Sequence, residues 1–198
     1  MTSEPDAAMS EHLAWVRWWA YPWKNSHRDW QRQDEPRGID VLDAIRASTL
    51  DIPPCLPPEP QHSQLRLVLA SAGQLELMLA LIRGTFSPGG ATQLTEDHQQ
   101  WCARRSKALS PEMLLPQSDP LQLLRAWVDP ATWERLRLRF PRSRVLEMEH
   151  NTGPLPMLNG RLNTLWQAVV WRATTTGTGT AHALSTQDLP SSTHAFTP

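Results

Sequence analysis

Prolines set the strongest constraint on what this chain can fold into. The chain holds 18 prolines among 198 residues, well above the usual level of about 5%, and five of the eight residues 53–60 are proline. Because proline fixes φ and lacks a backbone N–H donor, residues 53–60 cannot form a helix or a central strand. We expect an extended connector there, and short helices joined by ordered loops elsewhere.

Apolar residues recur at spacings of three and four along much of the chain, a pattern typical of helices. The longest run covers residues 64–83 and predicts one continuous, largely buried helix. Its seam is formed by Leu65, Val68, Ala72, Leu75, Leu79 and Ile82. A shorter run of Leu13, Val16 and Ala20 follows Ser10 and predicts a helix that ends before Pro22.

Capping signals predict further helices toward the carboxyl end. Ser110-Pro111, Asp119-Pro120 and Asp129-Pro130 each pair an N-capping side chain with a proline at the first helical position. A last helix is expected after Asn159, with Trp166 facing inward and Trp171 at a surface. Its predicted inner face consists of Leu162, Leu165, Trp166, Val169 and Ala173.

These patterns predict an all-α fold, a single orthogonally packed helical domain over residues 10–173. Arginines and apolar residues alternate from residue 135 to residue 140, which leaves room for a short β segment near 136–148. A short helix is expected near residues 40–47. We expect residues 1–9 and the Thr/Ser-rich residues 174–198 to be disordered.

Charge and cysteine content exclude several classes of function. The net charge of −1 argues against a globally basic nucleic-acid binder. Cys55 and Cys102 form no CxxC motif and no disulfide framework, and they favour a reducing compartment. His98 and Cys102 lie four residues apart, but two ligands do not make a structural zinc site. We expect no metal site and no cofactor.

No local motif indicates catalysis. The chain lacks a GxSxG elbow, an SxxK motif and a phosphate-binding glycine loop. We therefore expect a non-enzymatic protein without catalytic residues. A small helical enzyme whose site is assembled from distant residues is the alternative, and a pocket with clustered titratable groups would favour it.

Two local features point to partner binding, because tryptophan and arginine are enriched at the centres of protein interfaces. The residues predicted to contact a partner are Arg135, Arg137, Arg139, Arg142, Arg144, Trp18, Trp19 and Trp23. On this hypothesis, charge reversal at Arg139 and Arg142 weakens partner capture and leaves stability nearly unchanged. The alternatives are an arginine patch for nucleic acid, or a solvated face balanced by nearby glutamates. The tryptophans could likewise simply cover the core.

Three segments together resemble the SctK/HrpD accessory proteins of bacterial type III secretion systems. They are the leucine-rich stretch 64–83, the Trp-containing segment that ends in Leu-Arg-Leu-Arg-Phe-Pro141, and the closing Gly-Arg-Leu-Asn-Thr-Leu-Trp166 helix. The resemblance implies a mainly helical, non-catalytic bacterial protein of the cytoplasmic sorting platform. Such a protein would be associated with the inner membrane only through its partners. These would be the cytoplasmic domain of the inner-membrane ring protein, an SctQ-type pod protein and an SctL-type stator close to the ATPase.

Overall fold

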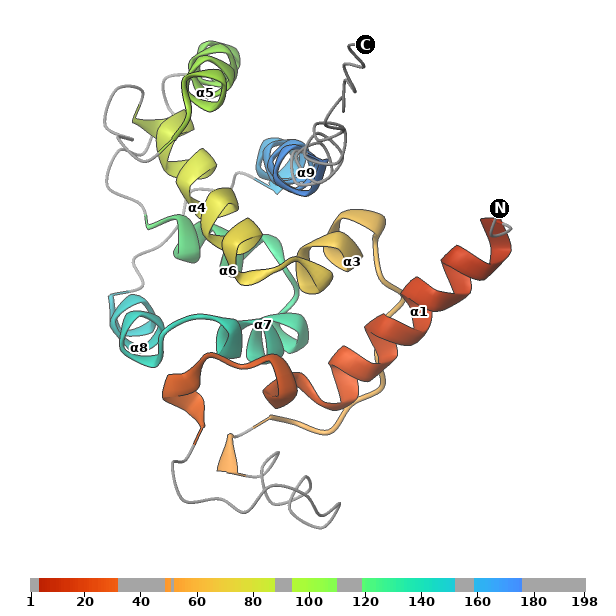
Figure 1. Ribbon diagram of the computed structural model, residues 1–198. Helices are drawn as coiled ribbons and strands as arrows, with labels where there is room; N and C mark the ends of the chain where they lie inside the picture. Colours follow the sequence, from red (N-terminus) through yellow and green to blue (C-terminus); the bar gives the residue numbers. More distant parts are fainter. Residues whose placement is uncertain are drawn as a thin grey trace, which may run out of the picture.

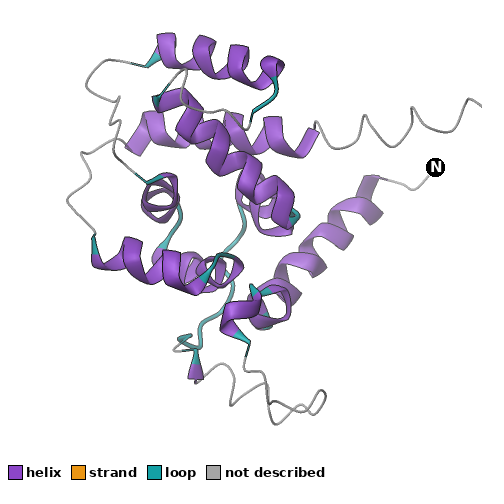
Figure 2. Cartoon of the chain, turned by 60° about the vertical axis from the view of Figure 1, so that its left-hand side comes forward, coloured by secondary structure: helices purple, strands orange, loops and turns teal. Residues whose placement is uncertain are grey.

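The computed structural model describes residues 4–31, 49–50, 52–87, 94–109, 119–151 and 159–175. Within these ranges all regular structure is helical and no strand is present (Figures 1 and 2). The prediction of an all-α, single helical domain is confirmed. None of the described helices has the length and apolar character needed to cross a membrane. The expected helix near 40–47, the Ser110-Pro111 cap and residues 176–198 lie outside the described residues.

The helices vary in length: the first and last each span 17 residues, whereas those that begin at Pro120 and Pro130 are short, as the prolines predict. In order they are α1 (Glu4–Ala20), the 3-10 helices η1 (Pro22–Asn25) and η2 (Arg28–Trp30), α3 (His62–Leu69), α4 (Ala72–Phe86), α5 (Glu96–Ala108), α6 (Pro120–Trp127), α7 (Pro130–Leu136), the 3-10 helix η4 (Arg137–Arg139), α8 (Arg142–His150) and α9 (Asn159–Thr175). Helix α1 begins at Glu4, so it already includes residues that precede Ser10.

Helix α4 lies at the centre of the fold, in contact with α5, α6 and α9 (Figure 1). Helix α9 also packs against α3 and α6, and its predicted inner face is buried throughout. Trp166 is buried and stacks on Trp127 with 5.5 Å between ring centroids, whereas Trp171 is exposed, as predicted. Helix α1 lies at one edge, where it contacts α3, and η1 contacts α7 and η4.

The seam of residues 64–83 is two helices and not one, which corrects the sequence interpretation. Helix α3 ends at Leu69, and Ser71 begins α4 with a capping box. The Ser71 hydroxyl accepts a hydrogen bond from the Gln74 amide, and the Gln74 side chain accepts one from the Ser71 amide. The apolar spacing runs across this break, so the periodicity alone does not reveal it. The Ser-x-x-Gln motif is the signal for a new helix start.

The short β segment near 136–148 is absent, since these residues belong to α7, η4 and α8. Leu136, Leu138 and Phe140 are all buried, because a tight 3-10 turn follows α7 and directs alternate side chains into the core. The predicted caps at Asp119 and Asp129 are confirmed: each carboxylate accepts a hydrogen bond from a backbone N–H in the first turn of its helix. Thr95 caps α5 in the same way.

Candidate functional site

The proline-rich residues 52–61, here called the strap, cross α1 without helical structure. Two tryptophans of α1 hold the strap by its main chain. Trp15 Nε1 donates a hydrogen bond of 3.1 Å to the Pro58 carbonyl, and Trp19 Nε1 donates one of 2.9 Å to the Cys55 carbonyl. This arrangement resembles the way aromatic-lined grooves bind proline-rich peptides, here within a single chain.

Arg135 of α7 is the third residue whose side chain binds the main chain of the strap. Its side chain is only 3% exposed, and its guanidinium lies over the Trp19 ring at 4.0 Å from the centroid. Nη2 donates to the Pro53 carbonyl at 3.1 Å and Nε donates to the Trp19 carbonyl at 3.1 Å, while Nη1 donates to the Ala131 carbonyl. One buried cation therefore joins α1, α7 and the strap, and the indole face stabilises its charge.

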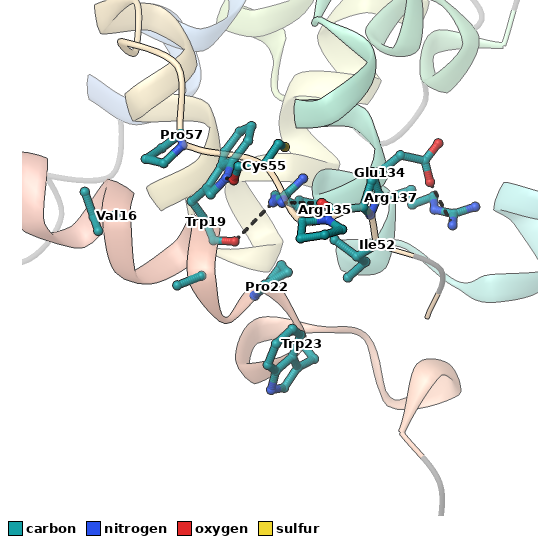
Figure 3. A pocket seen from close by; sticks show the side chains of 13 residues that line it. Val16, Trp19, Pro22, Trp23, Ile52, Cys55, Pro57, Glu134, Arg135 and Arg137 are labelled. Atoms are coloured by element: carbon teal, nitrogen blue, oxygen red, sulfur yellow. Dashed lines mark hydrogen bonds and ion pairs between the residues drawn. The ribbon is translucent and has the colours of Figure 1, made fainter. Parts of the chain in front are cut away.

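An open groove of about 1110 Å³ lies beside these hydrogen bonds, between the end of α1, the strap and α7 (Figure 3). Val16, Trp19 and prolines of the strap form much of its apolar wall. Glu134 and Arg137 line its polar edge and form an ion pair of 2.8 Å. The groove thus combines aromatic and proline surfaces with a paired charged rim.

The arginine run does not form an exposed patch, which corrects the sequence interpretation. Arg135 is buried as described, and Arg137 ion-pairs with Glu134 and with Glu149 at 3.5 Å. Arg144 lies 3.3 Å from Asp119 and forms a hydrogen-bonded ion pair with it. Among the five, only Arg142 is exposed.

Arg139 caps the carboxyl end of α3 by donating hydrogen bonds to two main-chain carbonyls. Nη1 donates to the Val68 carbonyl at 2.9 Å and Nη2 donates to the Ala70 carbonyl at 2.7 Å. The last carbonyls of a helix lack intrahelical partners, so one guanidinium fork satisfies both. Burial lowers the pKa of Arg139 below its ordinary value. We therefore now expect charge reversal at Arg139 to lower stability, and keep the expectation of unchanged stability for the exposed Arg142.

The predicted tryptophans are also buried. Trp18 and Trp19 pack with Trp15 as a three-ring cluster under α1, with 5.3 Å and 5.6 Å between the centroid of Trp15 and those of Trp18 and Trp19. Trp23 is buried with Ile52 and Leu138 in a second, smaller cluster. These rings cover the core, and Trp19 and Trp23 reach the surface only as part of the groove wall.

The exposed apolar surface lies instead on the opposite face of α1. Met9, Leu13 and Val16 are 65%, 52% and 42% exposed, and Ala20 is exposed as well. These four residues are here called the α1 seam. At 100° per residue they fall within an arc of about 60°, whose centre lies roughly 140° around the helix from that of the tryptophans. The spacing was visible in the sequence, but the helix has two apolar faces, and the larger tryptophan face is the buried one.

Leu56 on the strap is a further exposed apolar side chain. It is 90% exposed, and its chain neighbours Cys55 and Pro57 line the groove together with Val16. No single local motif indicated this surface, because it combines a helix face with a segment some 40 residues later in the chain.

A second polar cluster lies where α5 meets α4 and α9. His98 Nδ1 is 3.0 Å from the Thr95 hydroxyl, and Arg172 forms an ion pair with Asp97. Burial, followed by the charge of Arg172, lowers the pKa of His98. Burial raises the pKa of the Cys102 thiol, which donates to the Leu81 carbonyl. Within the described part of the chain no three His, Cys, Asp or Glu side chains gather as metal ligands.

Comparisons with protein-family models, curated proteins and solved structures find no match to this chain.

Proposed function

We propose that this protein is a non-enzymatic adaptor of a bacterial type III secretion apparatus, working in the cytoplasm at the inner membrane. Its partners would be the cytoplasmic domain of the inner-membrane ring protein, an SctQ-type pod protein and an SctL-type stator. The sequence resemblance of residues 64–83, the Arg-rich segment and the last helix supports the family role. The observation that carries the adaptor role is the exposed apolar surface made by the α1 seam and Leu56 beside the groove.

An apolar surface of this kind favours protein binding, since groups of exposed apolar side chains on a folded chain mark interaction sites. Trp15, Trp19 and Arg135 hold the strap and the carboxyl-terminal half of α1, which carries Val16 and Ala20, to the core. A surface that is already held rigidly against the core loses little conformational entropy when a partner binds. The groove adds concave apolar surface next to the α1 seam.

The nucleic-acid alternative loses its main support. It required the arginines of residues 135–144 on one continuous face, but Arg135 and Arg139 are directed into the fold and Arg137 and Arg144 are ion-paired with carboxylates. Cations used in this way contribute little to the phosphate contacts that nucleic-acid affinity depends on.

The test is affinity capture of the full chain from its native bacterium, together with secretion measured in a strain that lacks the gene. The proposal expects ring, pod or stator components in the captured material, and loss of type III secretion that the intact gene restores. Normal secretion without the gene, or capture of nucleic acid without those proteins, would contradict it. Salt-dependent binding to DNA would revive the arginine-patch alternative.

A further inference from the structure

We propose that the α1 seam docks one amphipathic helix of a partner protein in coiled-coil geometry, with acidic residues flanking the partner's own apolar seam. The inference rests on the proposed function, because it specifies the partner surface that such an adaptor would bind. Its occupant is a helix of another protein and not a second copy of this chain.

The spacing of the α1 seam identifies a helix as the occupant. Met9, Leu13, Val16 and Ala20 follow one another at intervals of four, three and four, which places them at alternating d and a positions of a heptad. A stripe limited to these two rows is the narrow seam of a coiled coil, whereas a helix that packs on a broad core shows a wider apolar face. From Met9 to Ala20 the seam extends about 16 Å along the helix, enough for three turns of a partner.

The position of α1 leaves the seam free for a partner. Every residue from Met9 to Leu13 is exposed, and the amino-terminal half of α1 points away from the other helices (Figure 1). A short helix without packing is marginal in water, since most helical stability in proteins comes from packing of an apolar face. A helix laid along Met9 and Leu13 would supply that packing where the tryptophan cluster does not reach.

Charges beside the α1 seam indicate the chemistry of the partner. With this assignment the e positions hold Ser10 and Arg17, and the g positions hold His12 and the buried Trp19. Arg17 is therefore the permanent cation on the flanks, and it is exposed. Lys24, just beyond the helix, is exposed as well and lies over the Tyr21 ring at 4.2 Å. Flanking e and g positions choose partners by charge, so acidic residues on the partner are favoured.

The same flanks disfavour a second copy of this chain. A parallel pair would bring Arg17 of one copy near His12 of the other, and an antiparallel pair would bring Arg17 near Arg17. The antiparallel arrangement opposes two arginines. Neither offers the acidic group that Arg17 favours.

A synthetic peptide tests the inference directly. The probe is a helical peptide of about three heptads, with leucine at a and d and glutamate at e and g; a second version has lysine at e and g. Like charges keep each peptide from pairing with itself. We expect the full chain to bind the glutamate peptide at least fivefold more tightly than the lysine peptide at low salt, by fluorescence anisotropy. The preference should shrink as salt is added.

Leu13→Glu should weaken binding of the glutamate peptide at least tenfold. The matched control is Leu146→Glu, because Leu146 lies on α8 and is 46% exposed; it should change binding less than twofold. Both variants alter exposed positions, so their thermal unfolding should match that of the parent chain. Equal binding by Leu13→Glu and the parent, no binding by either peptide, or a preference for the lysine peptide would overturn the inference.

Photo-crosslinking in the native cell separates this inference from the proposed function. A benzophenone amino acid at position 13 should crosslink to an apolar-seamed helix, whereas the same group at position 146 should not. Crosslinks to a second copy of this chain, or to a non-helical peptide, would overturn helix docking even if secretion components are captured. Crosslinks to a helix of an unrelated protein would support the docking mode and contradict the secretion role.

Discussion

Arg139→Met removes one guanidinium and keeps a long apolar side chain in its place. In the folded chain that guanidinium donates to the Val68 carbonyl at 2.9 Å and to the Ala70 carbonyl at 2.7 Å. Both carbonyls lie at the end of α3, where the break before Ser71 deprives them of intrahelical donors. The substitution therefore leaves two main-chain acceptors without the fork that satisfies them.

The expected loss follows from the hydrogen bonds and not from the charge alone. A hydrogen bond to a charged group contributes about 1.5–3 kcal/mol, and an orphaned buried acceptor costs about 1–3 kcal/mol. Because Arg139 is half-buried, water reaches part of the site, so we expect a loss of about 2–4 kcal/mol in the free energy of unfolding. For a domain of this size that lowers Tm by roughly 5–15 °C.

Chemical denaturation and thermal unfolding measure the loss, and Arg142→Met is the matched control. Arg142 is exposed and lies 5.4 Å from the centroid of the Trp30 ring, a contact that contributes about 0.5–1 kcal/mol at an exposed site. Arg139→Lys should fall between the two, since an ammonium cannot reproduce a planar fork. If Arg139→Met is no more destabilising than Arg142→Met, then the hydrogen bonds from Arg139 to the end of α3 do not stabilise the fold.

Three further outcomes are expected. Ser71→Ala should cost about 0.5–2 kcal/mol of stability by denaturant titration because it removes a capping-box acceptor; no loss would mean that the break does not depend on its cap. In the native state iodoacetamide should label the exposed Cys55 and not Cys102, whose burial raises its thiol pKa, and equal labelling would show that α5 opens. The lowered pKa of His98 favours its neutral form in the folded chain, so its contribution to stability is complete above pH 6.5 and is lost as the pH falls through the folded pKa. His98→Gln should remove that part of the acid sensitivity, and an unchanged pH profile would contradict this assignment.

The helical fold could be predicted because its signals are local. The Asp119 and Asp129 caps each act within three residues, and the inner face of α9 follows from a regular spacing. The break between α3 and α4 was missed because the apolar seam continues through it, and only the Ser71 capping motif marks it. Periodicity indicates that a stretch is helical; it does not indicate whether one helix or two form it.

The candidate site was harder to predict because its contacts join distant segments. Arg135 bonds to the strap across 82 residues, and Arg139 bonds to the end of α3 across about 70. In the sequence these arginines are a cluster of charges, and a charge cluster predicts a surface. The exposed face of α1 could not be predicted for a related reason: the helix has two apolar faces, and spacing alone does not indicate which of them packs on the core.

The strap prolines, three of the tryptophans and two internal arginines have one physical explanation in common. A proline-rich strap cannot pair its main chain in a helix or a sheet, so its carbonyls need donors from elsewhere. Tryptophan and arginine side chains offer donors and no acceptor, and Trp15, Trp19 and Arg135 donate to the carbonyls of Pro58, Cys55 and Pro53. Trp30 does the same for the Phe140 carbonyl directly before Pro141, and Arg139 does so at the end of α3. These side chains, whose residue types in isolation favour a binding surface, stabilise irregular backbone here, and the proposed binding surface consists of smaller apolar residues on the outer face of α1.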